Sequence, residues 1–355
     1  MDLGLLGWGP PFDALFDQSF AGKGYAPARI TRKEKHLYYA VSGEGETIAS
    51  VSGGYRHGID KISDYPVVGD WVAVARDETQ RDRSSIHGLV PRSTAFSRQA
   101  VTASGKERKV AEQVLAANVD VAILVAALDK GRGFNVRRIE RYLTLTWNSG
   151  AQPVVVLNKA DLAEDVDTAL AQAKEVAQDT PVYAVSALHG QAIDSLRAHV
   201  SNGTTLVLLG PSGVGKSSLI NRLAGEEIMR VGDVREFDAR GRHTTTWSEL
   251  TVLPSGGVLI DTPGLRDVQL WCDENSIDDT FREIVELASG CKFRDCAHGD
   301  EPGCAVREAV ESGDLGEARL RSYNQQKREV AQHAQATGRW MRNTEGRVAR
   351  RKKKR

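Results

Sequence analysis

The sequence predicts a multidomain protein in which an all-β unit precedes an α/β unit and a small helical module follows. Three observations carry this prediction. Short alternating apolar runs broken by glycine fill residues 27–106, strands alternate with amphipathic helices over 107–271, and three cysteines and a histidine gather near residue 300. A chain of 355 residues has room for two or three domains. Its 41% hydrophobic and 26% charged residues are typical of globular proteins.

Residues 1–26 mix glycine, proline and isolated aromatic residues, and we expect a weakly ordered lead-in. This segment lacks the basic flank and long apolar centre of a secretory signal. No apolar run in the chain approaches the length of a membrane span. We therefore expect a cytoplasmic protein without a membrane partner.

The segment 27–106 predicts a small β-barrel, because several short strands follow one another with turn signals between them. Its length suits a five-stranded OB-fold, which often binds nucleic acid. Tyr38, Tyr39, Tyr55 and Trp71 could stack on bases, but aromatic residues in strands more often belong to the core, and we favour the core. The expected strands cover 37–41, 47–51, 67–74 and 86–90.

A phosphate-binding loop is predicted between the apolar run 205–209 and the helical pattern 218–224. Glycines let backbone N–H groups surround a polyphosphate at a helix N-terminus. Lys216 would reach the outer phosphates, and Ser217 would ligate Mg²⁺. The alternative is a glycine-rich turn without a ligand. It is disfavoured because both the loop pattern and the flanking strand and helix patterns fit a phosphate-binding loop. The loop reads Gly210, Pro211, Ser212, Gly213, Val214, Gly215, Lys216, Ser217 and Ser218.

Two further motifs indicate that the nucleotide carries guanine. The predicted strand 154–157 runs into the N-K-x-D pattern, which selects guanine in Ras-like GTPases because its aspartate accepts from the ring N–H and the exocyclic amine. The strand 181–185 runs into an S-A-L pattern that would contact the base through its backbone. Asn158 and Asp161 disfavour a P-loop kinase or ATPase. Their residues are Asn158, Lys159, Asp161 and Leu162, and Ser186, Ala187 and Leu188.

Two switch segments complete the set. Asp261 and Gly264 belong to a D-x-x-G turn after the strand 257–260 and would sense Mg²⁺ and the γ-phosphate. The pattern G-R-H-T-T-T at 241–246 occupies the first switch, where Thr244 or Thr245 would ligate Mg²⁺. Ras-like enzymes orient the attacking water with a glutamine after the D-x-x-G turn, but this chain has Leu265 there. His243 is the nearest replacement; contact of its imidazole with backbone or RNA is the open alternative.

The order of these motifs predicts a circular permutation. The guanine motifs at 158 and 186 precede the phosphate loop at 210, whereas in Ras-like domains they follow the phosphate loop and both switches. A parallel α/β domain tolerates this because its termini lie at the surface, often close together. The run 119–125 then becomes the first strand of a doubly wound sheet, and the second switch leads directly into whatever follows residue 270.

The ordered motifs N-K-A-D, S-A-L, G-P-S-G-V-G-K-S, G-R-H-T-T-T and D-T-P-G resemble the RsgA (YjeQ) family of circularly permuted small ribosomal subunit biogenesis GTPases, over roughly 27–330. The resemblance implies an OB-fold, with 67–70 and 91–94 in its barrel. It also implies hydrolysis of GTP to GDP and phosphate with magnesium, and binding to the small ribosomal subunit and its rRNA late in assembly. A non-catalytic RNA-binding assembly chaperone with GTP as a structural or regulatory ligand is the alternative, and intact Lys216, Ser217 and Asp261 argue against it. We expect a monomer.

The cysteines predict a structural zinc site. Their C-x4-C-x-H-x5-C spacing offers three thiolates and one imidazole, which close a tetrahedral site, whereas disulfides are rare in the cytoplasm. Buried free cysteines with a surface histidine are the alternative. Cys272 stands apart, and we expect it to be a small buried hydrophobe. The expected ligands are Cys291, Cys296, His298 and Cys304, which match the family's zinc module at 272–335.

The end of the chain is strongly basic although the whole chain has a net charge of zero. Residues 321–355 hold 12 Lys and Arg against two Glu, so the tail carries +10 and the rest carries −10. We expect a helix over 314–330 and a disordered basic tail over 336–355. Such tails are often only solubilising, but we favour phosphate-directed RNA contact.

Overall fold

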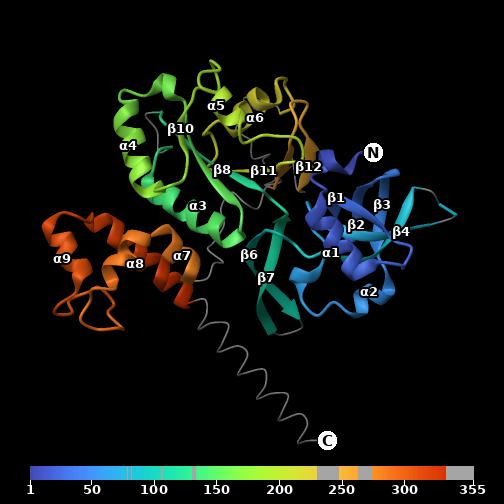
Figure 1. Cartoon of the computed structure of the whole chain (residues 1–355), viewed down its shortest axis with the longest axis horizontal. Coiled ribbons are helices and arrows are strands. Elements are labelled where there is room, and N and C mark those ends of the chain that lie inside the picture. The colour runs from blue at the N-terminus through green and yellow to red at the C-terminus, as the bar shows by residue number, and fades with distance from the viewer. Residues whose placement is uncertain are drawn as a thin grey trace, which may run out of the picture.

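The computed structural model describes residues 1–77, 79–80, 82–104, 107–129, 133–229, 248–262 and 274–332. A barrel, a central α/β domain and a helical module follow one another along the chain (Figure 1). Within the described ranges, no helix combines the length and apolarity needed to cross a bilayer. The first switch at 241–246, residues 263–265, Cys272 and the basic tail fall outside these ranges.

The N-terminal segment differs from the expected weakly ordered lead-in, because it forms η1 (Leu3–Leu6) and α1 (Pro10–Phe20). Proline at the first position starts α1, and its aromatic residues recur four apart, so they share one helix face. This face covers the barrel: Phe16 is buried, and the rings of Trp8 and Trp71 meet edge to face at 4.7 Å. Phe16 therefore belongs to the core, and the other aromatic residues of this segment are partly buried and pack against it.

A five-stranded barrel follows, as the sequence predicts. Its order is β1-β2-β3-β5-β4, and β4 pairs again with β1, which closes the barrel. Tyr38 and Trp71 are buried in it, in agreement with the core interpretation, whereas Tyr39 and Tyr55 are half-buried. The strands are β1 (Ala26–Glu34), β2 (Leu37–Ser42), β3 (Gly45–Val51), β4 (Trp71–Arg76) and β5 (Arg83–Leu89), with α2 (Gly53–His57) and η2 (Ile62–Asp64) between β3 and β4.

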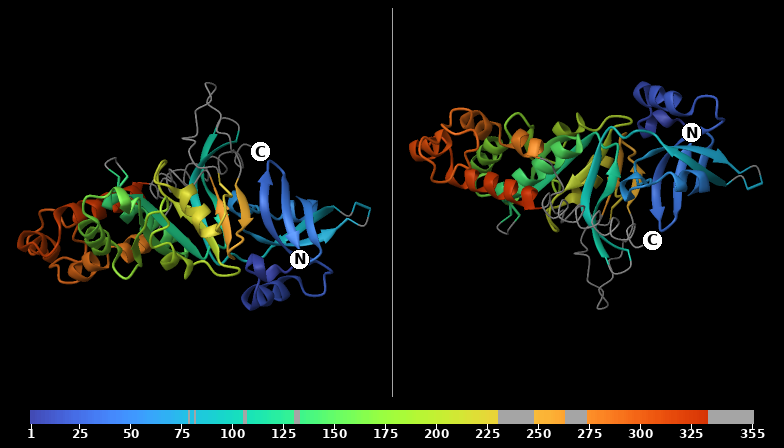
Figure 2. Two further views of the ribbon diagram at one scale, coloured as in Figure 1. Left: turned by 90° about the horizontal axis from the view of Figure 1, so that it is seen from above. Right: turned by 90° about the horizontal axis from the view of Figure 1, so that it is seen from below.

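A long antiparallel hairpin connects the barrel to the central domain. It consists of β6 (Ala95–Ser104) and β7 (Glu107–Ala117), and it projects from the body of the molecule (Figure 2). The boundary expected at 106 falls at its tip.

The central domain contains a doubly wound sheet of order β10-β9-β8-β11-β13-β12, parallel except for β12. One apolar cluster joins α3 and α4 to one face of this sheet, and a second joins α5 and α6 to the other. The strands are β8 (Val121–Ala127), β9 (Gln152–Asn158), β10 (Val182–Ala184), β11 (Thr205–Leu209), β12 (Glu249–Val252) and β13 (Val258–Asp261). The helices are α3 (Val136–Ser149), η3 (Ala160–Leu162), α4 (Val166–Ala177), α5 (Asp194–Arg197) and α6 (Lys216–Ala224).

The barrel and the central sheet meet along a polar seam. Arg32 of β1 pairs with Glu249 of β12, which makes the two sheets continuous. The fully buried Arg29 donates to the carbonyl of Asn118 at 3.1 Å and to Oγ1 of Thr205 at 2.9 Å. Burial lowers its pKa to about 10, and the charges of nearby aspartates oppose this shift. Arg29 therefore ties the barrel to the strand that leads into the phosphate loop.

The C-terminal module has its own apolar core and packs against α3 of the central domain (Figure 1). The hydroxyls of Thr144 in α3 and Thr280 in α7 are hydrogen-bonded at 3.0 Å. Its helices are α7 (Glu274–Thr280), α8 (Arg282–Ala288), α9 (Ala305–Ser312) and a last helix over 317–332.

Candidate nucleotide site and cysteine cluster

The loop between β11 and α6 has the backbone of a phosphate cradle. Gly213 and Gly215 have φ angles of 81° and 92°, in the left-handed region that favours glycine. A Cβ atom on Gly215 would lie 2.3 Å from Nδ2 of Asn158. A side chain there would break the packing between the loop and the N-K-x-D segment, so this position requires glycine.

Lys216 and the two serines that follow it begin α6. The Lys216 ammonium donates to the carbonyls of Gly210 and Pro211, both at 2.7 Å. It therefore lies inside the loop. Ser217 and Ser218 occupy the first turn, where backbone N–H groups have no partner within the helix. The cation and the helix N-terminus together make this loop attractive to an anion.

Asn158 joins three motifs that are far apart in the sequence. Its side chain is buried, Nδ2 donates to the carbonyl of Val214 at 2.8 Å, and Oδ1 accepts from the backbone N–H of Ala187 at 3.0 Å. One amide thus connects the N-K-x-D segment, the phosphate loop and the S-A-L segment. The structure therefore brings the predicted base motifs and the predicted phosphate motif to one edge of the sheet, beyond the carboxyl ends of the strands.

The rest of the N-K-x-D segment forms a short turn. Lys159 adopts a φ of 61°, and its ammonium lies 2.6 Å from Oδ2 of Asp129. Asp161 follows in η3, with its Oδ2 3.7 Å from Nε2 of His189. Leu162 and Leu188 are exposed. The carboxylate of Asp161 therefore faces the S-A-L loop across the edge of the sheet.

The S-A-L loop is held from two sides. Ser186 is fully buried and pairs with Gln191 through the backbone. From α6, Arg222 donates Nε to the carbonyl of Ala187 at 2.8 Å and Nη2 to the carbonyl of Leu188 at 2.5 Å. Arg222 could not be identified from the sequence, because no local signal connects a helical arginine to a loop 34 positions earlier.

The D-x-x-G segment begins where β13 ends. β13 lies beside β11, so Asp261 leaves the sheet next to the strand that enters the phosphate loop. Among the described residues, the buried Oγ1 of Thr262 has no hydrogen-bond partner. His243, Thr244, Thr245 and Gly264 lie outside the described residues, so their placement stays a prediction.

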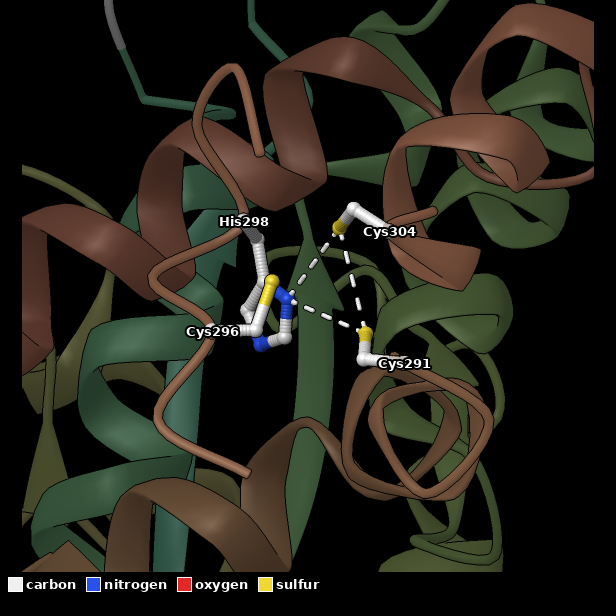
Figure 3. A group of neighbouring side chains, drawn as sticks. All are labelled: Cys291, Cys296, His298 and Cys304. Carbon is white, nitrogen blue, oxygen red and sulfur yellow. Dashed lines mark hydrogen bonds between the residues drawn. The ribbon is translucent and has the colours of Figure 1, made fainter. Parts of the chain in front are cut away.

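The cysteine cluster forms a second site, in the C-terminal module. Nδ1 of His298 lies 3.7 Å from Sγ of Cys291 and 3.5 Å from Sγ of Cys304, and these two sulfurs are 3.9 Å apart (Figure 3). All four ligand atoms, including Sγ of Cys296, lie within 4.8 Å of one another. Tetrahedral zinc with bonds of about 2.3 Å to sulfur and about 2.0 Å to nitrogen separates its ligands by roughly 3.5–3.8 Å. The donor set and its spacing therefore fit zinc.

The local fold prepares these groups as ligands. Cys304 is the N-cap of α9, and the backbone N–H groups of Val306 and Ala305 donate to Cys291. Burial lowers the pKa of His298, which favours the neutral imidazole that binds metal. Helix α9 thus supplies one ligand and stabilises a second.

Comparisons with known proteins agree with this architecture. Residues 89–271 match the family model described as RsgA GTPase. The chain is 45% identical over 339 residues to the small ribosomal subunit biogenesis GTPase RsgA of Opitutus terrae, covering 93% of this chain and 90% of the relative. It is 44% identical to the RsgA of Streptomyces coelicolor, over 91% of this chain and 85% of the relative.

Two solved structures are also similar. The crystal structure of YjeQ from Thermotoga maritima has a TM-score of 0.63 and 26% identity, and the match covers 86% of this chain and 99% of that one. The structure of YloQ, described as a circularly permuted GTPase, has a TM-score of 0.59 and 25% identity, and the match covers 87% and 96%. These matches confirm the permuted fold.

Proposed function

The chain belongs to the RsgA GTPase family, and on that premise we propose that it binds the small ribosomal subunit and couples GTP hydrolysis to late assembly and its own release. The chain is a GTPase. The names of its relatives specify the small subunit. Asn158, which joins the base motifs to the phosphate loop, is the observation in this chain that best supports nucleotide-dependent action.

The predicted motifs divide the nucleotide between them in this proposal. Asp161 accepts from the guanine ring and its amine, and the S-A-L backbone faces the carbonyl of the base. The backbone from Gly210 to Ser218 surrounds the phosphates, and Lys216 neutralises them. Magnesium, held by Ser217 and one of Thr244 and Thr245, would offset the charge on the phosphates. Asp261 and Gly264 would respond to the γ-phosphate.

We assign the orientation of the attacking water to His243. Leu265 can neither donate nor accept a hydrogen bond, so the glutamine of Ras-like enzymes has no equivalent at that position. Slow intrinsic hydrolysis follows from this. Binding energy from the small subunit would order the first switch and bring His243 to the water.

The flanking domains serve as RNA-binding parts in this proposal. We assign 27–106 to the OB-fold with 1–26 as its helical cover, 107–271 to the GTPase, 272–335 to a zinc module and 336–355 to a basic tail. The fit of the donor set described above supports one structural zinc bound by Cys291, Cys296, His298 and Cys304. The tail would add salt-dependent contact with rRNA phosphates.

A turnover assay tests the proposal. GTP and ATP hydrolysis by the full chain are measured with and without purified small subunits, and Lys216→Ala serves as the inactive control. We expect slow GTP hydrolysis that subunits accelerate, and no comparable ATP hydrolysis. Binding of GTP without turnover in the presence of subunits would instead support an assembly chaperone that uses GTP as a ligand.

A further inference from the structure

Arg222 lies outside the motifs that carry the proposed function. It nevertheless donates hydrogen bonds to the S-A-L loop, which is expected to face the base. It stands near the end of α6, the helix whose first residues close the phosphate loop. Its guanidinium donates to two consecutive carbonyls, those of Ala187 and Leu188, at 2.8 and 2.5 Å. A planar guanidinium with two parallel donors fixes the direction of both carbonyls.

These two hydrogen bonds determine the direction of the backbone N–H of Leu188. The chain has no cis peptide bond among its described residues, so the carbonyl of Ala187 and the N–H of Leu188 point in opposite directions from one planar unit. With the carbonyl turned toward Arg222, the N–H of Leu188 turns away from α6.

The neighbouring N–H groups of this loop are already engaged. The N–H of Ala187 donates to Oδ1 of Asn158 at 3.0 Å, and that of His189 donates to Oγ of Ser186 at 3.3 Å. The N–H of Leu188 has no hydrogen-bond partner among the described residues. It is therefore the donor that this stretch of loop offers to a ligand.

We propose that Arg222 is a positioning residue for base recognition, holding the peptide between Ala187 and Leu188 so that its N–H donates to the 6-oxo group of guanine. This inference rests on the proposed guanine site. The 6-amino group of adenine would meet the same N–H as a donor, so the arrangement favours guanine over adenine. Arg222 would thus connect α6, the helix that follows the phosphate loop, to the loop that selects the base.

The test compares two nucleotides that differ at the base. Dissociation constants of the full chain are measured for GDP and for the diphosphate of 2-aminopurine riboside, which keeps the 2-amino group but lacks the 6-oxo group and the ring N1–H. In Arg222→Met, we expect the preference for GDP to fall about three- to tenfold, the range of one lost hydrogen bond. Affinity for the 2-aminopurine nucleotide should change little. Arg222→Lys, which keeps the charge but has no paired donors, should lose part of the preference and serves if the methionine variant does not fold.

Arg197→Met is the matched control. Arg197 donates to the carbonyl of Arg222 at 3.2 Å and lies close to α6, but it makes no hydrogen bond to the S-A-L loop. Its loss should leave the preference unchanged. Equal weakening of both nucleotides in Arg222→Met, or an equal loss of preference in Arg197→Met, would overturn the positioning role. A parent protein that does not prefer GDP would instead overturn the guanine site itself.

Discussion

Arg319 of the last helix and Glu140 of α3 form an ion pair inside the contact between the C-terminal module and the central domain, with Nη1 and Oε1 2.7 Å apart. Both side chains are buried, and Oγ of Ser322 donates to the second oxygen of Glu140 at 2.6 Å. Arg319 also donates to Glu283 and to the carbonyl of Thr280. One arginine thus links the module's own helices to the domain that contains the predicted switches.

Arg319→Met should loosen this contact, because it leaves the buried carboxylate of Glu140 with only Arg137 and Ser322 as partners. Loss of one member of a buried pair costs about 3–5 kcal/mol, and because Arg137 remains beside Glu140 the cost should lie at the lower end of this range. We expect a matching loss in the free energy of unfolding and faster amide exchange over 274–332. Adding Glu140→Gln should recover part of the loss. As the control, Arg307→Met removes an exposed pair with Glu317 and should cost less than about 1 kcal/mol. If Arg319→Met and Arg307→Met lowered the free energy of unfolding equally, the buried pair would contribute no more to stability than the exposed pair.

Asp161→Asn should weaken GTP binding and improve binding of xanthosine triphosphate, in which a carbonyl replaces the guanine amine. The amide of asparagine can donate to that carbonyl, whereas the carboxylate can only accept. Titration of the parent and the variant with both nucleotides measures the change in their relative affinities. Unchanged GTP affinity would remove Asp161 from the site.

Cys296→Ser and His298→Ala should each abolish the binding of about one zinc per chain. Because metal binding and folding are coupled in small modules, amide exchange over 274–332 should accelerate while nucleotide binding remains measurable. Metal analysis of purified protein gives the primary readout. Cys272→Ser is the control, since Cys272 lies outside the predicted ligand set and its loss should leave the zinc in place. A metal-free parent protein with a well-protected module would contradict the zinc assignment.

His243→Ala should keep GTP binding but lose most of the acceleration by small subunits. We expect the subunits to raise turnover of the parent protein at least about tenfold, roughly 1.4 kcal/mol off the barrier. Single-turnover hydrolysis with and without subunits separates this effect from binding. If subunits stimulate the variant as strongly as the parent, a ribosomal group acting in trans orients the water.

The sequence alone determined the parts whose signal is local. A phosphate loop needs glycines and a lysine at fixed spacing between a strand and a helix, so Gly210 to Ser218 could be recognised without a fold. The same holds for Asn158 and Asp161 after their strand, and for the cysteine spacing. The permutation also followed from motif order, because order along the chain is itself a property of the sequence.

The tertiary structure decided the contacts between segments that are distant in the chain. Glycine and proline around residues 7–11 indicated a loose lead-in, but burial against Trp71 makes the segment that contains them a helical cover of the barrel. The partners of Arg29, Arg222 and Arg319 are backbone carbonyls, a hydroxyl and carboxylates up to 179 positions away. The sequence does not distinguish an arginine that will be exposed to solvent from one that will be buried. Only folding removes the water around the guanidinium and brings those distant acceptors within hydrogen-bonding distance.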